Sequence, residues 1–297
     1  MGSRMGMAGL ASLIVAAPSM AAEKAPVELA PTTPWNVPYA DDYCRLARFF
    51  GEGKQRVILS MEQGEPGDGF RLTLAGAILD GPGGKDEASI TFGELGEQKL
   101  QFFPGTVGDD MPAWIFSGNI RIRPYSTDDG RFAAKHGYYP DSAGPISEAD
   151  KAAAASLLIG RPLRQPVRLK TGPMKAAFTA MNSCTDELLE HWGIDAARHR
   201  ERSRSAMPVG SPGKWLNSND YPPAMLAKGQ PGLVRFRLSV GADGVPTACH
   251  IQRSTNGKPF DDAVCKGVMR RARFEPALDK DGQPLASYYV NAVQFQF

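Results

Sequence analysis

The sequence predicts an α+β protein with two domains, an N-terminal mixed antiparallel-sheet and helix domain and a small C-terminal domain with the element order β-β-α-β. The chain of 297 residues is longer than most single compact domains. Short alternating apolar runs occupy residues 56–123, helical patterns occupy residues 147–192, and new alternating runs begin at residue 233. Because 42% of the residues are hydrophobic and 22% are charged, both domains can fill a core.

Residues 1–22 are predicted to be a secretory signal peptide. Residues 5–17 are apolar apart from Ser12, and the small-residue site Ser19-Met20-Ala21 follows. This stretch is shorter than the ~20 apolar residues that a membrane-spanning helix needs. We therefore expect cleavage and export to the periplasm or the extracellular space, with an uncleaved membrane anchor as the alternative. The four prolines of residues 23–38 then predict an extended leader.

The N-terminal domain is expected to span residues 39–195. A short helix carrying Cys44 is predicted over residues 41–50, where two aspartates precede apolar residues at helical spacing. Residues 125–145 show no clear period and are expected to be irregular. Between these segments the alternation predicts antiparallel strands at residues 57–61, 70–79, 89–92, 99–103 and 114–123.

Two helices and a short strand complete the predicted N-terminal domain. Ser147 and Asp150 fit a capping box at the start of a helix that reaches Ile159. A short strand is predicted at residues 167–170, and a longer helix then ends near Trp192, with Gly193 as its C-cap. The apolar residues of the longer helix form one stripe, which is expected to be buried: Ala177, Met181, Cys184, Leu188 and Trp192.

The four cysteines are predicted to form disulfides, because an exported chain meets an oxidising compartment. Sequence alone permits three pairings. Cys44 with Cys184 is the first predicted pair, with two reduced buried thiols as the alternative. Cys249 with Cys265 is the second, because their spacing of 16 residues suits a strand and the helix packed over it. The cysteines and histidines lack zinc-like spacing, so no metal site is predicted.

Residues 196–219 are predicted to be a basic linker. A run of arginines from Arg198 to Arg204 is followed by serine, proline and glycine up to Lys214. We expect a solvated segment, with a weak contact to anionic lipid or cell-wall material as the alternative. The formal net charge of +2 is too small to predict a nucleic-acid partner.

The C-terminal domain is predicted from its alternation and its turns. Residues 233–240 place Val234 and three further apolar side chains on one face, and place Arg235 and Arg237 on the other, which is expected to be wet. The turn at residues 241–244 has glycine where positive φ is needed. The remaining predicted elements are a strand at 247–254, a helix at 260–272 and a strand at 287–297.

Residues 220–297 resemble the C-terminal domain of the TonB family of periplasmic energy transducers. The residues that carry the resemblance are Tyr221-Pro222, Ala224, Gly229, Gly232, Val234, Asp243-Gly244, Ser254, Ala263 and Arg273-Phe274-Glu275-Pro276-Ala277. The resemblance implies a module that binds the TonB-box segment of an outer-membrane receptor by adding it as a strand to a sheet edge. The edge implied is the last strand: Tyr288, Tyr289, Val290, Asn291, Ala292, Val293, Gln294 and Phe295.

The sequence also departs from this family. Family members carry an uncleaved transmembrane helix that contacts inner-membrane motor proteins, followed by a long spacer rich in proline and lysine, and we expect neither here. The leading hypothesis is a periplasmic TonB-like binding protein linked to transmembrane transport. The alternatives are an anchored energy transducer for TonB-dependent uptake, working with those motor proteins, and a cell-wall-acting enzyme. The same edge strand also allows a homodimer.

An enzyme is the least favoured of these classes. The sequence has neither a Gly-x-Ser-x-Gly elbow nor a His-Glu-x-x-His zinc site, and its histidines are scattered. We therefore predict no catalytic residues and no cofactor.

Overall fold

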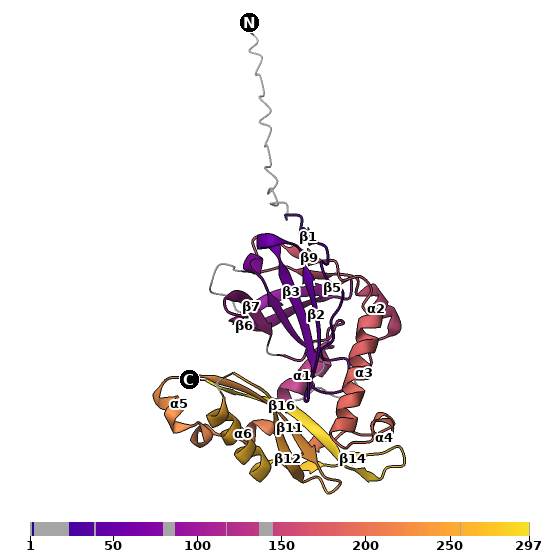
Figure 1. Ribbon diagram of the computed structural model, residues 1–297, viewed down its shortest axis with the longest axis vertical. Helices are drawn as coiled ribbons and strands as arrows, with labels where there is room; N and C mark the ends of the chain where they lie inside the picture. Colours follow the sequence, from indigo (N-terminus) through magenta and orange to yellow (C-terminus); the bar gives the residue numbers. More distant parts are fainter. Residues whose placement is uncertain are drawn as a thin grey trace.

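The computed structural model describes Gly2 and residues 24–38, 40–79, 87–116, 118–136, 145–255 and 257–296. Apart from Gly2, the predicted signal peptide lies outside the described residues. Figure 1 shows two bodies, a large N-terminal domain of strands and helices and a smaller C-terminal domain. The α+β class and the two-domain arrangement are thereby confirmed. None of the described helices is both long enough and apolar enough to cross a bilayer.

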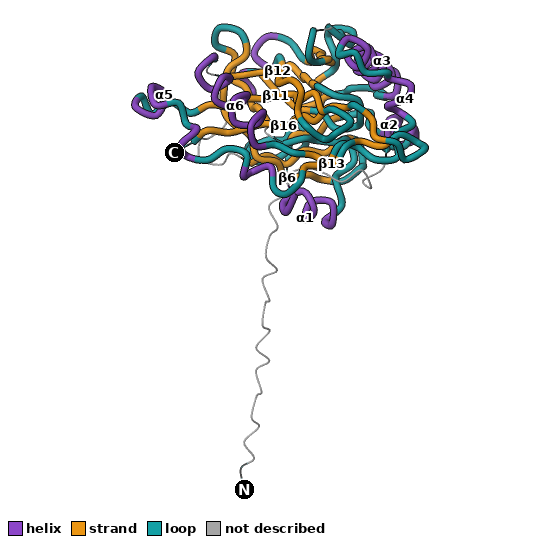
Figure 2. Tube along the Cα trace, turned by 90° about the horizontal axis from the view of Figure 1, so that it is seen from below, coloured by secondary structure: helices purple, strands orange, loops and turns teal. Residues whose placement is uncertain are grey.

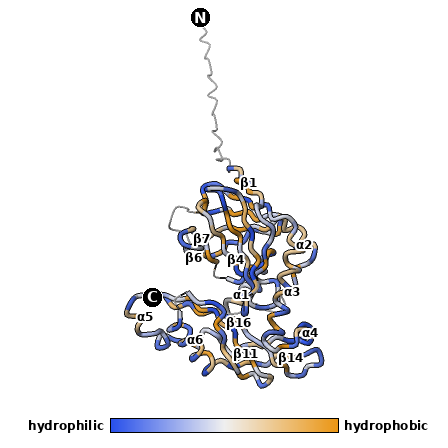
Figure 3. Tube along the Cα trace, viewed as in Figure 1, coloured by the Kyte–Doolittle hydropathy of each residue, from blue (hydrophilic) through white to orange (hydrophobic). Residues whose placement is uncertain are grey.

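Within the described residues, nine strands of the N-terminal domain form one sheet in the order β1-β9-β8-β5-β6-β7-β4-β3-β2. The β1–β9 pair is parallel and the other neighbours are antiparallel. The strands are β1 (Val27–Leu29), β2 (Cys44–Phe50), β3 (Val57–Gln63), β4 (Arg71–Ala75), β5 (Glu87–Phe92), β6 (Glu97–Val107), β7 (Met111–Phe116), β8 (Leu157–Ile159) and β9 (Val167–Leu169). Figure 3 shows hydrophobic residues running along these strands, where alternate side chains enter the core.

The segment predicted as an extended leader, residues 23–38, is part of this sheet. Its described residues form β1, and then bridge at Pro31 and Asn36 to β2, the strand at the opposite end of the sheet order. The segment therefore joins the two ends and curls the sheet into a near-barrel (Figure 1). Prolines are tolerated here because edge pairing needs only some of the backbone donors.

The helix predicted around Cys44 is wrong. Residues 44–50 form β2, and all seven pair with β3. Cys44, Leu46 and Phe50 are buried while intervening residues are partly exposed. Spacing over so short a segment fits either structure, and pairing with the neighbouring strand decides the outcome.

Among the described residues of the N-terminal domain, one helix was not predicted, one is shorter than predicted and one is confirmed. The region 125–145, expected to be irregular, contains α1 (Thr127–His136), where Ser126 Oγ accepts from the Asp129 amide and the Asp129 carboxylate accepts from Ser126. The Ser147 side chain caps α2 (Glu148–Ala153) by accepting a hydrogen bond from the Asp150 amide, as predicted. The helix ends earlier than predicted, and residues 157–159 form β8. The longer helix is confirmed as α3 (Lys175–His191), followed by Gly193 at a φ of 74°.

Both predicted disulfides are confirmed. Cys44 on β2 is bonded to Cys184 on α3, with their Cα atoms 6.0 Å apart. Cys249 is bonded to Cys265, with a Cα separation of 5.6 Å. The two disulfides are consistent with an oxidising compartment.

The C-terminal domain has the predicted order β-β-α-β. Its sheet has the order β12-β11-β16, formed by β11 (Gly232–Val240), β12 (Pro246–Ser254) and β16 (Ser287–Phe295), and α6 (Lys258–Arg271) covers one face. Figure 2 shows α6 and α5 (Pro223–Ala227) on the side away from α3. Two small additional pairs are β10 (Met207–Pro208) with β13 (Phe274–Glu275) and β14 (Ala277–Leu278) with β15 (Pro284–Leu285).

Residues 196–219 are built into this domain rather than forming a solvated linker. They contain α4 (Ala196–Arg200), β10, and the short 3-10 helices η4 (Pro212–Lys214) and η5 (Ser218–Asp220). Trp215 packs edge-on against Phe274 and Tyr289 in the domain core. The arginine run contributes to this packing: Arg198 lies 2.6 Å from a carboxylate oxygen of Asp279. A charge run in the sequence does not show which carboxylates fold against it.

Candidate functional site

The face of the C-terminal sheet that was predicted to be wet is the interface between the domains. Arg237 on β11 is 3% exposed. Its guanidinium carbon lies 4.0 Å from the ring centroid of Trp192, at the end of α3, and its Nη2 lies 3.7 Å from Asp42. Burial lowers the pKa of Arg237, and Asp42 opposes that shift. The alternation of β11 was read correctly, but the polar face meets protein rather than solvent.

Polar contacts fasten the other side of the interface. Arg253 on β12 donates to Glu62 on β3 over 2.7 Å. The side-chain amide of Gln252 donates to the carbonyl oxygens of Asp42 and Gly64, each at 2.9 Å. A Cβ at Gly64 would lie 2.8 Å from this amide, so a larger residue there would have to displace the end of the Gln252 side chain.

The first residues of β16 are anchored to α3 and α4. The ring of Tyr288 packs edge-on against Trp192 and stacks on His199, with centroid distances of 5.4 and 5.1 Å. His199 Nε2 lies 2.8 Å from the Ser287 hydroxyl. Burial lowers the pKa of His199 to about 4, with a smaller effect of the same sign from Arg202. The neutral imidazole therefore belongs to the packed interface.

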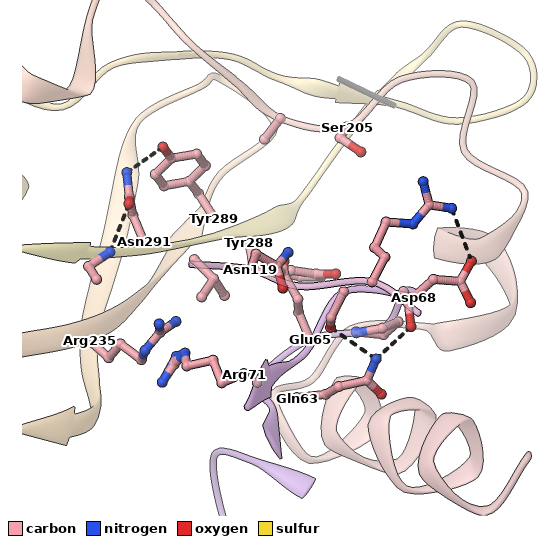
Figure 4. A pocket seen from close by; sticks show the side chains of 18 of the residues that line it. Gln63, Glu65, Asp68, Arg71, Asn119, Ser205, Arg235, Tyr288, Tyr289 and Asn291 are labelled. Atoms are coloured by element: carbon pink, nitrogen blue, oxygen red, sulfur yellow. Dashed lines mark hydrogen bonds and ion pairs between the residues drawn. The ribbon is translucent and has the colours of Figure 1, made fainter. Parts of the chain in front are cut away.

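Beyond Tyr289 the outer edge of β16 opens. Within the described residues, β16 pairs with β11 and is the last strand of its sheet. The Ala292 amide donates to Asn291 Oδ1 over 2.8 Å, so this amide points away from β11. Because backbone groups alternate in direction along an antiparallel strand, those of Val290 and Gln294 point outward together with those of Ala292. Figure 4 shows the Asn291 amide held in place by its hydrogen bond to Tyr289.

Two hollows open on this edge from opposite faces of the sheet. The interdomain cleft, about 660 Å³, lies between β16, β11 and the N-terminal loop of residues 63–71. The apolar groove, about 470 Å³, lies on the α6 side and is lined by Trp215, Leu216 and the second half of β16. Asn291 and Ala292 line both. A strand added to this edge would therefore direct alternate side chains into the two hollows.

A bidentate ion pair holds the wall of the apolar groove. Arg271 on α6 donates to both carboxylate oxygens of Asp220, at 2.9 and 2.7 Å, and to the carbonyl oxygen of Trp215. The hydrogen bond from Arg271 lowers the pKa of Asp220. Because the segment from Trp215 to Asp220 is tied to α6, it forms a fixed wall facing β16.

The structure places the predicted edge residues on one strand but gives them different environments. Tyr288 and Tyr289 are buried, residues 290–293 are half-buried, Gln294 is exposed and Phe295 is buried. The accessible part of the edge is therefore residues 290–294. Sequence reasoning missed the contributions of Arg71, Arg235 and Trp215 to the hollows, because turns and alternation do not show which distant segments meet. In the described part of the chain, no three His, Cys, Asp or Glu side chains gather as metal ligands.

A comparison with known families matches the domain that carries this edge. Residues 217–297 match the family described as Gram-negative bacterial TonB protein C-terminal. Residues 217–297 are a TonB C-terminal domain. The match confirms the resemblance seen in the sequence, and it covers about a quarter of the chain, none of it in the near-barrel. No curated protein matches this chain. The TonB C-terminal domain indicates a role in TonB-like energy transduction or receptor interaction, since such domains typically bind TonB boxes of outer-membrane receptors.

Proposed function

We propose that this protein is a periplasmic binding protein whose TonB C-terminal domain recognises the TonB-box segment of an outer-membrane receptor by strand addition at β16, in the service of transmembrane transport. The family match together with the open edge at residues 290–294 carries the proposal. Backbone hydrogen bonds to the outward groups of Val290, Ala292 and Gln294 would supply affinity. The two hollows beside the edge would supply selectivity.

The compartment and the class of activity are part of the same proposal. Both disulfides favour an oxidising compartment, and the signal peptide expected at residues 1–22 favours the periplasm. We assign a binding role and no catalytic group, because the fold presents a strand edge flanked by fixed walls. Contact with a motor protein is not needed for this step.

The direct test is NMR shift mapping of the mature protein with synthetic TonB-box peptides. We expect saturable shifts concentrated on residues 290–294. Ala292→Pro removes an outward amide while leaving the β11 ladder intact, and should weaken binding about tenfold or more. Ala292→Ser keeps the amide and serves as the matched control. Equal binding by the proline and serine variants, or no response to any peptide, would contradict strand addition.

Asn291 is expected to compete with the incoming strand. Its side-chain oxygen already accepts the Ala292 amide, so an added strand must displace it. Asn291→Ala should therefore tighten peptide binding, by about fivefold if one net hydrogen bond is freed. Titration calorimetry with one TonB-box peptide measures the change. Unchanged or weaker binding would show that Asn291 assists docking instead of blocking it.

A further inference from the structure

We propose that the interdomain cleft is an anion subsite, built by Arg71 of the near-barrel and Arg235 of the TonB C-terminal domain, that selects an acidic side chain on the strand added at β16. The inference rests on the proposed function and specifies the class of peptide. It also gives the N-terminal domain a direct part in recognition.

The two arginines reach the cleft from different domains. Arg71 begins β4 and follows the loop that forms one wall, whereas Arg235 lies on the central strand β11, directly opposite Ala292. Arg235 is therefore one strand away from the accessible edge, on the face that looks toward the near-barrel. Figure 4 shows the two guanidinium groups pointing into the cleft toward one another.

Two of the three carboxylates that line the cleft are paired with other cations. The lining contains four arginines and three carboxylates. Glu62 pairs with Arg45 at 2.8 Å and with Arg253 at 2.7 Å. Asp68 accepts from the backbone of Ile146 and lies 3.8 Å from Lys151 and 3.9 Å from Arg121. The third carboxylate, Glu65, has a contact of its own.

Within the described part of the chain, neither Arg71 nor Arg235 lies within ion-pair distance of a carboxylate, and Glu62 is paired with Arg45 and Arg253 instead. The Nε atoms of Arg71 and Arg235 are buried and make no hydrogen bond there. Burial lowers the pKa of Arg235 to about 10, although Glu62 and Glu65 oppose that shift. A buried N–H group that lacks an acceptor is costly, and a carboxylate placed between the two guanidinium groups would offer one oxygen to each of them.

The register of an added strand decides which side chains meet these arginines. Side chains of an extended segment alternate between the two faces of the sheet. Those directed to the face of Arg235 enter the interdomain cleft, and those directed to the face of Phe236 enter the apolar groove. The ligand class is therefore an extended peptide in which an acidic residue is flanked, one position away on either side, by apolar residues.

The test uses two synthetic peptides that alternate valine and threonine and differ at one threonine position, which is glutamate in one and glutamine in the other. We expect the full chain to bind the glutamate peptide about tenfold more tightly, the difference that one charge-assisted hydrogen bond makes. Arg71→Gln and Arg235→Gln should each reduce this preference, measured in every variant as the ratio of the affinities for the glutamate and the glutamine peptide. Arg71→Lys, which keeps the charge, should retain part of it, and thermal unfolding of every variant verifies the fold.

The outcomes separate the inference from the function on which it rests. Equal binding of both peptides at β16 would overturn the anion subsite and leave strand addition standing. Failure of both peptides to bind would remove strand addition and the inference together. Inorganic phosphate is the second probe: saturable shifts at Arg71 and Arg235 with phosphate, combined with equal binding of the peptides, would assign the cleft to a free anion and overturn the peptide assignment.

Discussion

Replacing both Cys44 and Cys184 with alanine is expected to lower the free energy of unfolding of the N-terminal domain by about 5 kcal/mol. The disulfide closes a separation of 140 residues, and in the chain-entropy model a loop of that length restricts the unfolded chain strongly. Both cysteines are fully buried. Alanine is preferred to serine because a hydroxyl at either site would be buried in an apolar core.

The loss should spread beyond the near-barrel, because the disulfide joins β2 to α3 and Trp192 at the end of α3 packs against Arg237 of the partner domain. Urea unfolding followed by circular dichroism measures the change. The Cys249→Ala, Cys265→Ala variant is the matched control, since its separation of 16 residues corresponds to about 3 kcal/mol and lies within the TonB C-terminal domain. A smaller loss for the longer loop would contradict the loop-length explanation.

Local patterns predicted the C-terminal domain more accurately than the N-terminal one. The alternation in residues 233–240 and the glycine turn that follows define β11 and its hairpin without reference to distant residues. The segment around Cys44 is different, because its spacing fits a helix while its pairing with β3 makes it a strand. Residues 23–38 are rich in proline and show no period, so their place between the two ends of the sheet was not predictable from local preference.

The candidate site divides in the same way. Its edge strand was predicted because the resemblance covers residues that are continuous in sequence. The interdomain cleft was not, because Arg71 and Arg235 are far apart in the chain and meet only through the docking of two domains. Alternation showed that Arg235 and Arg237 share a face, yet it could not show that the face is covered. Contacts such as that of Arg237 with Trp192 follow from tertiary structure alone.

Acidification from pH 7 to pH 5 is expected to destabilise the protein by about 2 kcal/mol through His199. Burial holds its pKa near 4 in the folded protein, below the ordinary value of 6.5. In this interval the unfolded chain takes up a proton that the folded chain does not, so stability is complete above pH 6.5 and is lost as the pH falls toward 4. The imidazole stacks on Tyr288 and contacts Ser287, so the loss should loosen the anchored end of β16.

His199→Gln separates this effect from other titrations, because glutamine can retain the contact with Ser287 but does not titrate. The free energy of unfolding, measured in urea by tryptophan fluorescence at pH 7 and pH 5, should change less with pH in this variant than in the wild type. His250→Gln is the matched control. Burial also lowers the pKa of His250, but that residue is only half-buried and should contribute less to the change of unfolding free energy with pH. Parallel slopes for His199→Gln and the wild type would show that the buried imidazole does not govern acid stability, and that the anchor of β16 persists when the compartment acidifies.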